Sequence, residues 1–169
     1  VAQEMLRSHR PPRDHSERMI RNNFVTMQQI RTLQSHPLSP ELVCDIHRCV
    51  TEDTLGDNDE AGRFRNADEL VAIYDDRNRL LHDPPPAAEL HDRMQRLCDF
   101  ANATDDTFVH PVIRAILLHF MVGYDHPFTD GNGRTARALF YWSMLHNGYW
   151  WAEYISISHI VLKARAQYG

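Results

Sequence analysis

The sequence has few cysteines, and none of them form a metal-binding pair. Cys44, Cys49 and Cys98 are the three cysteines among the 169 residues, and no two of them have the CxxC spacing. An odd count without that spacing argues against a disulfide framework and against a cysteine zinc site. The pattern is typical of reduced, buried thiols, so we expect a cytoplasmic protein.

The sequence also lacks an excess of positive charge and a long apolar segment. Its formal net charge is −5, so we expect no direct nucleic-acid binding through a general basic field. The longest apolar stretch, "AILLHFMVGY" from Ala115, contains a histidine and is too short to cross a bilayer, so we expect no membrane insertion. No internal repeat or low-complexity linker divides the chain, and its length suits one domain with a single core.

Most of the chain shows helical periodicity. A first long helix is predicted to begin with Ser16 as its N-cap and to end before Pro37, and a second begins at Pro40 with Ser39 as its N-cap. The apolar positions of the first long helix recur at steps of three and four, at Ile20, Phe24, Met27, Ile30 and Leu33.

Further helices are predicted on both sides of one segment with a different period. They comprise a short one before Pro11, one through Leu90–Cys98, an apolar and centrally buried one over 110–124, one over 134–146 and one from Ser156 onward.

The different period lies in "ELVAIYDDRNRLLHDPPP", which covers residues 69–86. Val71 and Ile73 precede a polar turn at residues 75–78, and Leu80 and Leu81 follow it, which predicts a β-hairpin. A lone hairpin is marginally stable unless it packs on or pairs with something else. The fold class predicted from these patterns is an all-α domain that carries one β-hairpin.

The segment "HPFTDGNGRTAR", residues 126–137, lies between two predicted helices. The turn at Gly131, Asn132 and Gly133 can direct successive N–H groups to one side, and the following helix adds its own free N–H groups and dipole. Arg134 and Arg137 are three residues apart and share a helix face, so both guanidinium groups can reach one polyphosphate. The pattern predicts an anion site for a nucleoside triphosphate.

An acid and a base flank this predicted anion site. Asp130 would repel phosphate unless a divalent cation lay between them, which favours Mg²⁺ as a cofactor; the alternative, compatible with the first, is an N-cap role. His126 is the nearby side chain suited to accept a proton near neutral pH. Together the residues indicate an attack by a hydroxyl group on phosphorus, with His126 as the general base.

The twelve residues resemble the signature of the Fic family, His-Pro-Phe-x-Asp/Glu-Gly-Asn-Gly/Lys-Arg-x-x-Arg, and every specified position is present. "SERMIRNN", "EAGRFR", "LHDPPPAAEL", "HPVIRAILLHF" and "GYWWAEYISIS" also resemble the bacterial Fic-domain type, so the resemblance covers nearly the whole chain. It implies a Fic-type helical bundle that transfers AMP from ATP to a Ser, Thr or Tyr hydroxyl of a target protein.

The resemblance also implies a role for each matching residue. His126 is the base, and Asp130 holds Mg²⁺ on the α- and β-phosphates. The other motif positions bind ATP, with the turn on phosphate and the arginines on the distal phosphates: Gly131, Asn132, Gly133, Arg134 and Arg137. The hairpin resembles the flap that pairs with the backbone of the target, formed here by Val71, Ala72, Ile73, Leu80 and Leu81.

Alternatives to these roles stay open. The hairpin could be plain structure, and a homodimer is left open. A sister Fic activity could transfer a phosphoryl group, another nucleotide or phosphocholine, or the domain could bind partners without catalysis. The kinase-like branch carries Lys where this sequence has Gly133, which favours AMP transfer.

Many Fic proteins silence themselves with a helix that bears Ser/Thr-x-x-x-Glu-Gly/Asn, whose glutamate pairs with the second motif arginine, here Arg137. No Ser or Thr in the sequence has that pattern. We therefore expect residues 1–169 to be a single Fic domain from a longer chain, without the N-terminal inhibitory segment and the C-terminal remainder. We expect this form to be more active than an extended one.

Overall fold

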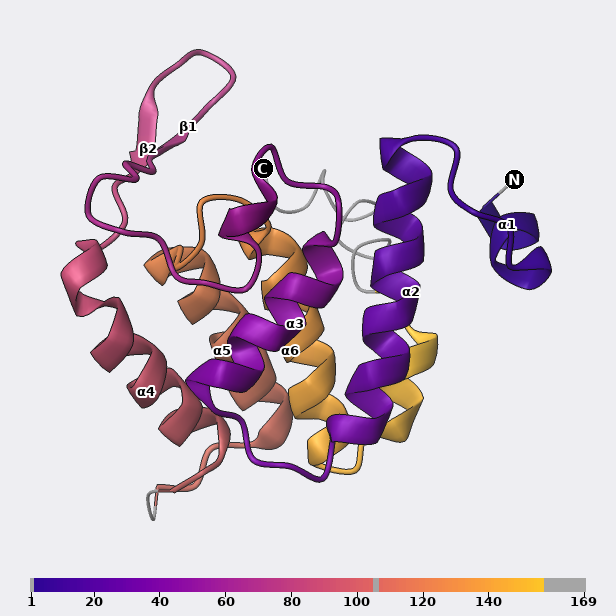
Figure 1. Cartoon of the computed structure of the whole chain (residues 1–169). Coiled ribbons are helices and arrows are strands. Elements are labelled where there is room, and N and C mark those ends of the chain that lie inside the picture. Colours follow the sequence, from indigo (N-terminus) through magenta and orange to yellow (C-terminus); the bar gives the residue numbers. More distant parts are fainter. Residues whose placement is uncertain (1, 105–106, 157–169) are drawn as a thin grey trace.

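Six helices and one short hairpin follow one another in the computed structural model, which describes residues 2–104 and 107–156 (Figure 1). The prediction of an all-α domain with one hairpin is confirmed. Three short 3₁₀ segments lie at Asn58–Glu60, Ala87–Glu89 and Trp150–Tyr154. The α-helices are α1 (Ala2–Ser8), α2 (His15–Leu33), α3 (Pro40–Thr51), α4 (Leu90–Ala101), α5 (Pro111–Asp125) and α6 (Asn132–His146).

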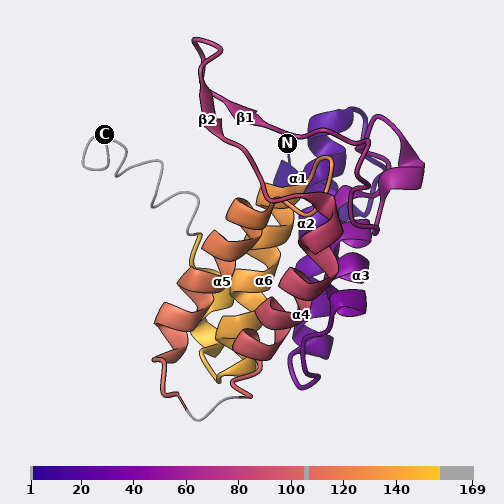
Figure 2. The ribbon, with the colours of Figure 1, turned by 90° about the vertical axis from the view of Figure 1, so that its left-hand side faces the viewer.

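The hairpin projects from one end of the helical bundle (Figures 1 and 2). Strands β1 (Ile73–Tyr74) and β2 (Leu80–His82) are antiparallel, with an irregularity in the register between the two residues of β1. The Asp75 carboxylate closes the turn by accepting hydrogen bonds from the backbone N–H groups of Arg77 and Arg79. The predicted hairpin and its polar turn are therefore confirmed.

The caps of α2 and α3 differ in how well the sequence predicted them. Ser39 caps α3 as expected, with its hydroxyl accepting from the N–H of Leu42. Asp14, and not Ser16, caps α2, because its carboxylate accepts from the N–H of Glu17. Both residue types are good N-caps, so the sequence pattern did not separate them.

The apolar stripe predicted for α2 is only partly buried. Ile30 is buried, but Ile20 and Phe24 are exposed. The first half of α2 packs instead on the polar turn that follows α3, where the Asn22 amide donates to the Glu52 carbonyl at 2.7 Å. This half of the helix therefore buries polar side chains: Glu17, Asn22 and Thr26.

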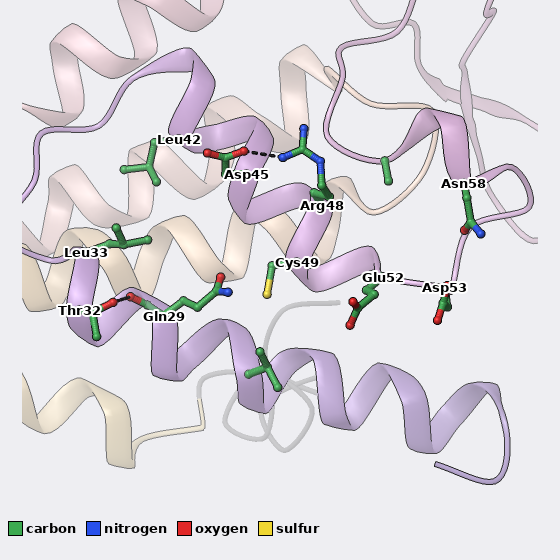
Figure 3. A pocket seen from close by; sticks show the side chains of 12 residues that line it. Gln29, Thr32, Leu33, Leu42, Asp45, Arg48, Cys49, Glu52, Asp53 and Asn58 are labelled. Atoms are coloured by element: carbon green, nitrogen blue, oxygen red, sulfur yellow. Dashed lines mark hydrogen bonds and ion pairs between the residues drawn. The ribbon is translucent and has the colours of Figure 1, made fainter. Parts of the chain in front are cut away.

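A surface hollow of about 830 Å³ lies between α2 and α3 (Figure 3). Gln29 of α2 and Cys49 of α3 point into it from opposite sides, and an Asp45–Arg48 ion pair borders it. None of the residues 126–137 line this hollow. The chemistry predicted from the sequence therefore lies elsewhere.

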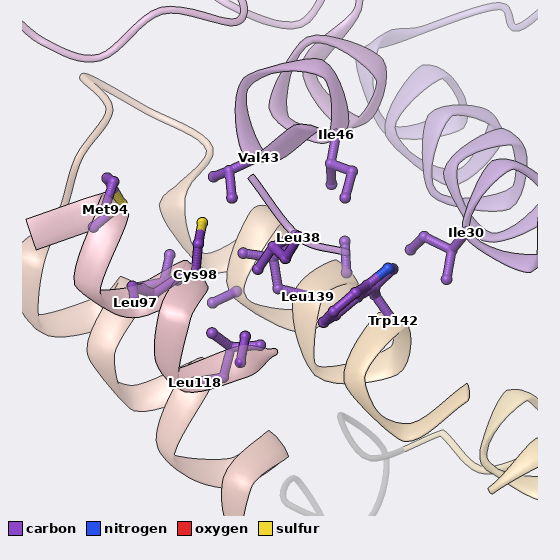
Figure 4. Close-up of a cluster of buried hydrophobic side chains, with 14 of the residues drawn as sticks. Ile30, Leu38, Val43, Ile46, Met94, Leu97, Cys98, Leu118, Leu139 and Trp142 are labelled. Atoms are coloured by element: carbon purple, nitrogen blue, oxygen red, sulfur yellow. The ribbon is translucent and has the colours of Figure 1, made fainter. Parts of the chain in front are cut away.

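The core is built around α6, which packs against α5, α2 and α3. Trp142 and Leu139 of α6 are completely buried, and side chains of the other long helices surround them (Figure 4). Burying one such side chain stabilises the fold by roughly 1.5–3 kcal/mol. The partners in this core include Ile30, Val43, Ile46, Met94, Leu97, Cys98 and Leu118.

The prediction of a centrally buried helix over 110–124 was wrong for one face of α5. The side that contacts α4 and α6 is buried, but the opposite side is exposed. A helix that is apolar on most faces does not show clearly in its sequence which face is covered, and α6 takes the central place. The exposed side consists of Ile113, Ile116, Leu117, Phe120 and Tyr124.

Two further sequence predictions concern a helix at the C-terminal end and the absence of a membrane span. The helix expected from Ser156 onward falls on residues 157–169, which lie outside them. Within residues 2–104 and 107–156, no helix has both the length and the apolar character that crossing a membrane requires.

Candidate active site

His126 ends α5 and begins the loop that leads to α6. Its backbone is left-handed, with φ 46° and ψ 58°, and its N–H donates to the Val122 carbonyl at 3.0 Å. Its Nδ1 atom lies 3.3 Å from the Gly123 carbonyl. An Nδ1–H donor leaves Nε2 unprotonated, and no hydrogen bond to Nε2 occurs in the described parts of the chain.

The protein around His126 favours its neutral form. Burial lowers the pKa of His126, and the positive charge of Arg65 lowers it further, against the hydrogen bond to Gly123. A neutral imidazole with a free Nε2 can accept a proton at neutral pH. The geometry therefore suits the general base predicted at this position.

Two buried residues give the loop its shape. The Phe128 ring is fully buried and stacks on the His47 ring, with centroids 3.7 Å apart. The Asn132 side chain accepts from the N–H of Phe128 at 2.9 Å and donates to the carbonyl of Phe128 at 2.7 Å. Because the amide is committed inside the loop, only the backbone N–H of Asn132 is available for the phosphate contact predicted from the sequence.

His47 of α3 packs against the loop at 126–131, and this role was not predicted from the sequence. Its Nε2–H donates to the Asp130 carbonyl at 2.9 Å, and its Nδ1 accepts from the N–H of Gly62 at 2.9 Å. Burial lowers the pKa of His47 to about 4, so the ring is neutral. Its position in step with Val43 and Val50, on the inward face of the helix, was the available signal.

The turn at Gly131 requires glycine. Its φ is +82°, and a Cβ atom here would lie 2.5 Å from the Thr51 methyl group and 3.0 Å from the His47 ring. Gly133 is different, because a Cβ there would meet only the Arg137 guanidinium, at an ordinary 3.6 Å. The Arg137 side chain therefore lies beside the first turn of α6.

The N-terminus of α6 is open to an anion. The helix begins at Asn132, two residues before the predicted start, and no side chain caps it. The N–H groups of Asn132, Gly133 and Arg134 precede the first intrahelical bond, which Thr135 donates to Gly131. These N–H groups and the helix dipole have the arrangement that the predicted anion cradle requires.

Asp130 and Arg134 lie at the edge of this cradle and pair with each other at 3.0 Å. Arg134 also donates to the Thr54 hydroxyl at 2.6 Å, and the Asp130 carboxylate accepts from the N–H of Gly131 at 2.5 Å. Gly131 occupies the N-cap position of α6, so the alternative role of Asp130 as that cap is wrong.

The charges around the cradle fit a polyphosphate. Within residues 2–104 and 107–156, no carboxylate forms an ion pair with Arg137 and no cluster of three acidic, His or Cys side chains could hold a metal alone. Partial burial and the charge of Arg134 lower the pKa of Arg137, so an anion here would relieve the repulsion. Mg²⁺ is commonly held by one or two carboxylates together with substrate phosphates, and Asp130 fits that arrangement.

The hairpin adjoins the site through its base. His82 at the end of β2 contacts the Tyr124 carbonyl through Nε2 at 2.6 Å, and its ring packs on the Tyr124 ring. Of the residues predicted to form the flap, Leu80 and Leu81 are exposed, and Val71, Ala72 and Ile73 are half-buried. The base of the hairpin thus lies close to His126, and its strand residues are exposed or half-buried.

Comparison with known proteins agrees with this geometry. Residues 37–144 match the model of the Fic/DOC family. The chain is 36% identical over 108 residues to a protein adenylyltransferase Fic of Nematostella vectensis, covering 63% of the chain and 22% of that protein. It is 31% identical over 131 residues to the protein of the same name from Culex quinquefasciatus, covering 76% and 21%. The chain spans about a fifth of the length of these curated relatives.

Solved structures show the same fold. A Fic-domain signaling protein from Bacteroides thetaiotaomicron superposes with a TM-score of 0.75 at 20% identity, over 87% of this chain and 56% of that one. A Fic family protein from Desulfovibrio desulfuricans gives 0.75 at 22%, over 99% and 48%. Fic-1 from C. elegans, residues 134–508, gives 0.69 at 25%, over 87% and 42%.

Proposed function

The chain belongs to the Fic/DOC family, and on this premise we propose that it is a protein adenylyltransferase. It would transfer AMP from ATP to a Ser, Thr or Tyr hydroxyl of a target protein. The observation that carries the proposal is an uncapped N-terminus of α6, with Arg134 and Arg137 in its first two turns. It follows a histidine whose Nε2 has no hydrogen bond within residues 2–104 and 107–156. The names of the relatives support the same activity.

In the proposed reaction, the target hydroxyl oxygen forms a bond to the α-phosphorus of ATP. His126 accepts the hydroxyl proton at Nε2. The bond from the α-phosphorus to the oxygen that bridges to the β-phosphate breaks, and pyrophosphate leaves. A positioned base of this kind contributes about 10²–10⁴ to the rate.

The remaining motif residues hold the nucleotide in this proposal. The N–H groups of Gly133 and Arg134 donate to phosphate oxygens, and Arg137 binds the distal phosphates. Asp130 would hold a Mg²⁺ ion together with the phosphates, and when bound this ion supplies charge neutralisation at the α- and β-phosphates. Thr54 keeps the Arg134 guanidinium oriented through its hydroxyl.

The hairpin would position the target. A two-stranded hairpin leaves the outer edges of both strands free to pair with an extended segment of another protein. Leu80 and Leu81, both exposed, would contact that segment. The cytoplasmic location and the bacterial type stay predictions from the sequence, as does the homodimer that was left open.

The proposal is tested by finding which phosphate of ATP is transferred to protein. The chain is incubated with Mg²⁺ and ATP labelled on either the α- or the γ-phosphate, with a cell lysate as the source of targets. We expect protein labelling from the α-phosphate only, and a mass increase equal to AMP on a hydroxyl side chain. Labelling from the γ-phosphate would indicate phosphoryl transfer instead, and no labelling of any protein would contradict catalysis.

A further inference from the structure

Arg65 lies between α3 and the hairpin in the sequence, and its side chain is directed at backbone carbonyls. The residue is 8% exposed. Its Nε–H donates to the His126 carbonyl at 2.9 Å, and its Nη2 donates to the Pro85 carbonyl at 2.5 Å and to the Asp125 carbonyl at 3.5 Å. Its own backbone N–H donates to the Pro127 carbonyl at 2.9 Å.

A buried cation without an ion-paired carboxylate needs an explanation. In the described part of the chain no carboxylate forms an ion pair with Arg65. Burial lowers the pKa of its guanidinium, against the more distant charges of Asp83 and Glu69. Burying such a charge is costly unless its donors are satisfied. A smaller neutral donor would avoid this cost but would not reach several carbonyls at once, since only the planar fork of arginine presents five donors in fixed directions.

The carbonyls belong to segments that are distant in sequence. Arg65 precedes β1, which begins at Ile73, and Pro85 follows β2, which ends at His82. One residue therefore joins the entry and the exit of the hairpin to the end of α5 and to the loop that begins at His126. Apart from the His82–Tyr124 contact, this junction is the main polar attachment between hairpin and loop among the described residues.

We propose that Arg65 is a positioning residue that fixes the hairpin, and with it the target hydroxyl, at a set place relative to His126. The inference rests on the proposed function, because it concerns the alignment of the acceptor with the base. A misplacement of about 1 Å between reacting groups costs roughly a hundredfold in rate. Arg65 has no hydrogen bond to the N-terminus of α6 or to the arginines there among the described residues, so we expect nucleotide binding to be independent of it.

The test compares Arg65→Lys with Arg63→Lys. Lysine at 65 keeps the charge but loses the fork, so it cannot reach both the His126 and the Pro85 carbonyls. Arg63 is the matched control, since it lies two residues away and binds Glu69 with both terminal nitrogens but contacts none of residues 125–127. Melting temperatures of both variants establish that they fold.

Three quantities are measured on the full chain: the ATP dissociation constant, the rate of AMP transfer to protein, and hydrogen exchange of the hairpin amides. For Arg65→Lys we expect unchanged ATP affinity, transfer slowed about ten- to a hundredfold, and faster exchange over residues 73–82. Arg63→Lys should match the wild type in all three. The His126 pKa, followed by NMR, should stay near its wild-type value in Arg65→Lys because the charge is kept.

The outcomes separate this inference from the proposed function. Absence of AMP transfer in the wild type would refute the proposed function. Unchanged hydrogen exchange of the hairpin amides in Arg65→Lys would independently refute the role of Arg65 in fixing the hairpin. Loss of ATP affinity would also overturn the inference, since Arg65 would then act on the nucleotide. Faster exchange with an undiminished transfer rate would show that the junction is structural only.

Discussion

The loop that follows α5 and the hairpin beside it are built in opposite ways. The loop has Phe128 at 0% exposure, with the Asn132 side chain bonded inside it and the His47 ring beneath it. The hairpin has only two strands, and Leu80 and Leu81 are 55% and 63% exposed. The loop is packed against the bundle through its buried side chains, and the hairpin is attached only at its base.

The difference corresponds to two different tasks in the proposed reaction. Chemistry at phosphorus needs a base and anion donors that do not move, because reorganisation during the reaction raises the barrier. Recognition of an extended segment needs an unpaired strand edge, and both strands of this hairpin have one. In the proposed reaction, the packed loop would therefore serve the chemistry and the open hairpin would serve the target.

The largest effect is expected from His126→Ala. AMP transfer should fall by about 10²–10⁴, because the base is lost, while ATP affinity stays near normal. His36→Ala is the control, since His36 is exposed and lies outside the motif. Transfer rate and ATP affinity are measured together, and full activity of His126→Ala would remove this residue from the mechanism.

The rigidity of the loop is tested by a pair of glycine variants. Gly131→Ala places a Cβ atom 2.5 Å from the Thr51 methyl group in a left-handed backbone, so we expect a loss of roughly 2–3 kcal/mol in the free energy of unfolding and weaker ATP binding. Gly133→Ala should leave stability unchanged or slightly raised, since its Cβ meets only Arg137 at 3.6 Å. The free energy of unfolding of both variants is measured by denaturant unfolding. Equal values for Gly131→Ala and Gly133→Ala would contradict the tight packing assigned to Gly131.

The buried His47 makes the loop sensitive to acid. Its pKa is 6.5 as a free side chain and about 4 in the folded protein, so below pH 6.5 the unfolded chain binds more protons and unfolding becomes easier. We expect this residue to remove about 2 kcal/mol of stability between pH 6.5 and 5. The slope of unfolding free energy against pH should be smaller in His47→Gln, and identical slopes would refute the buried neutral ring.

A smaller effect on target modification is expected from a substitution in the hairpin. Ile73→Pro removes a strand N–H, so target modification should fall about tenfold while ATP affinity persists. Ile73→Ala is the control, because it shortens the side chain but keeps the N–H. If Ile73→Pro modifies its target at the wild-type rate, the hairpin has only a structural role.

The sequence predicted the six described α-helices, the hairpin and the motif loop because each depends on local signals. It did not predict the contacts of His47 with Asp130 or of Arg65 with Pro85, since these join residues far apart in the chain. It also assigned a central, buried place to α5, because a helix that is apolar on most faces gives only a weak periodic sign of its exposed face. The α2 cap was misplaced by two residues, between two side chains of similar capping strength.

The separation of chemistry from target recognition is tested most directly by measuring pyrophosphate release from ATP without any protein target, where water is the acceptor. We predict that Ile73→Pro releases pyrophosphate at the wild-type rate although it modifies its target poorly, whereas His126→Ala loses both reactions. Loss of pyrophosphate release in Ile73→Pro, or its survival at full rate in His126→Ala, would contradict the account.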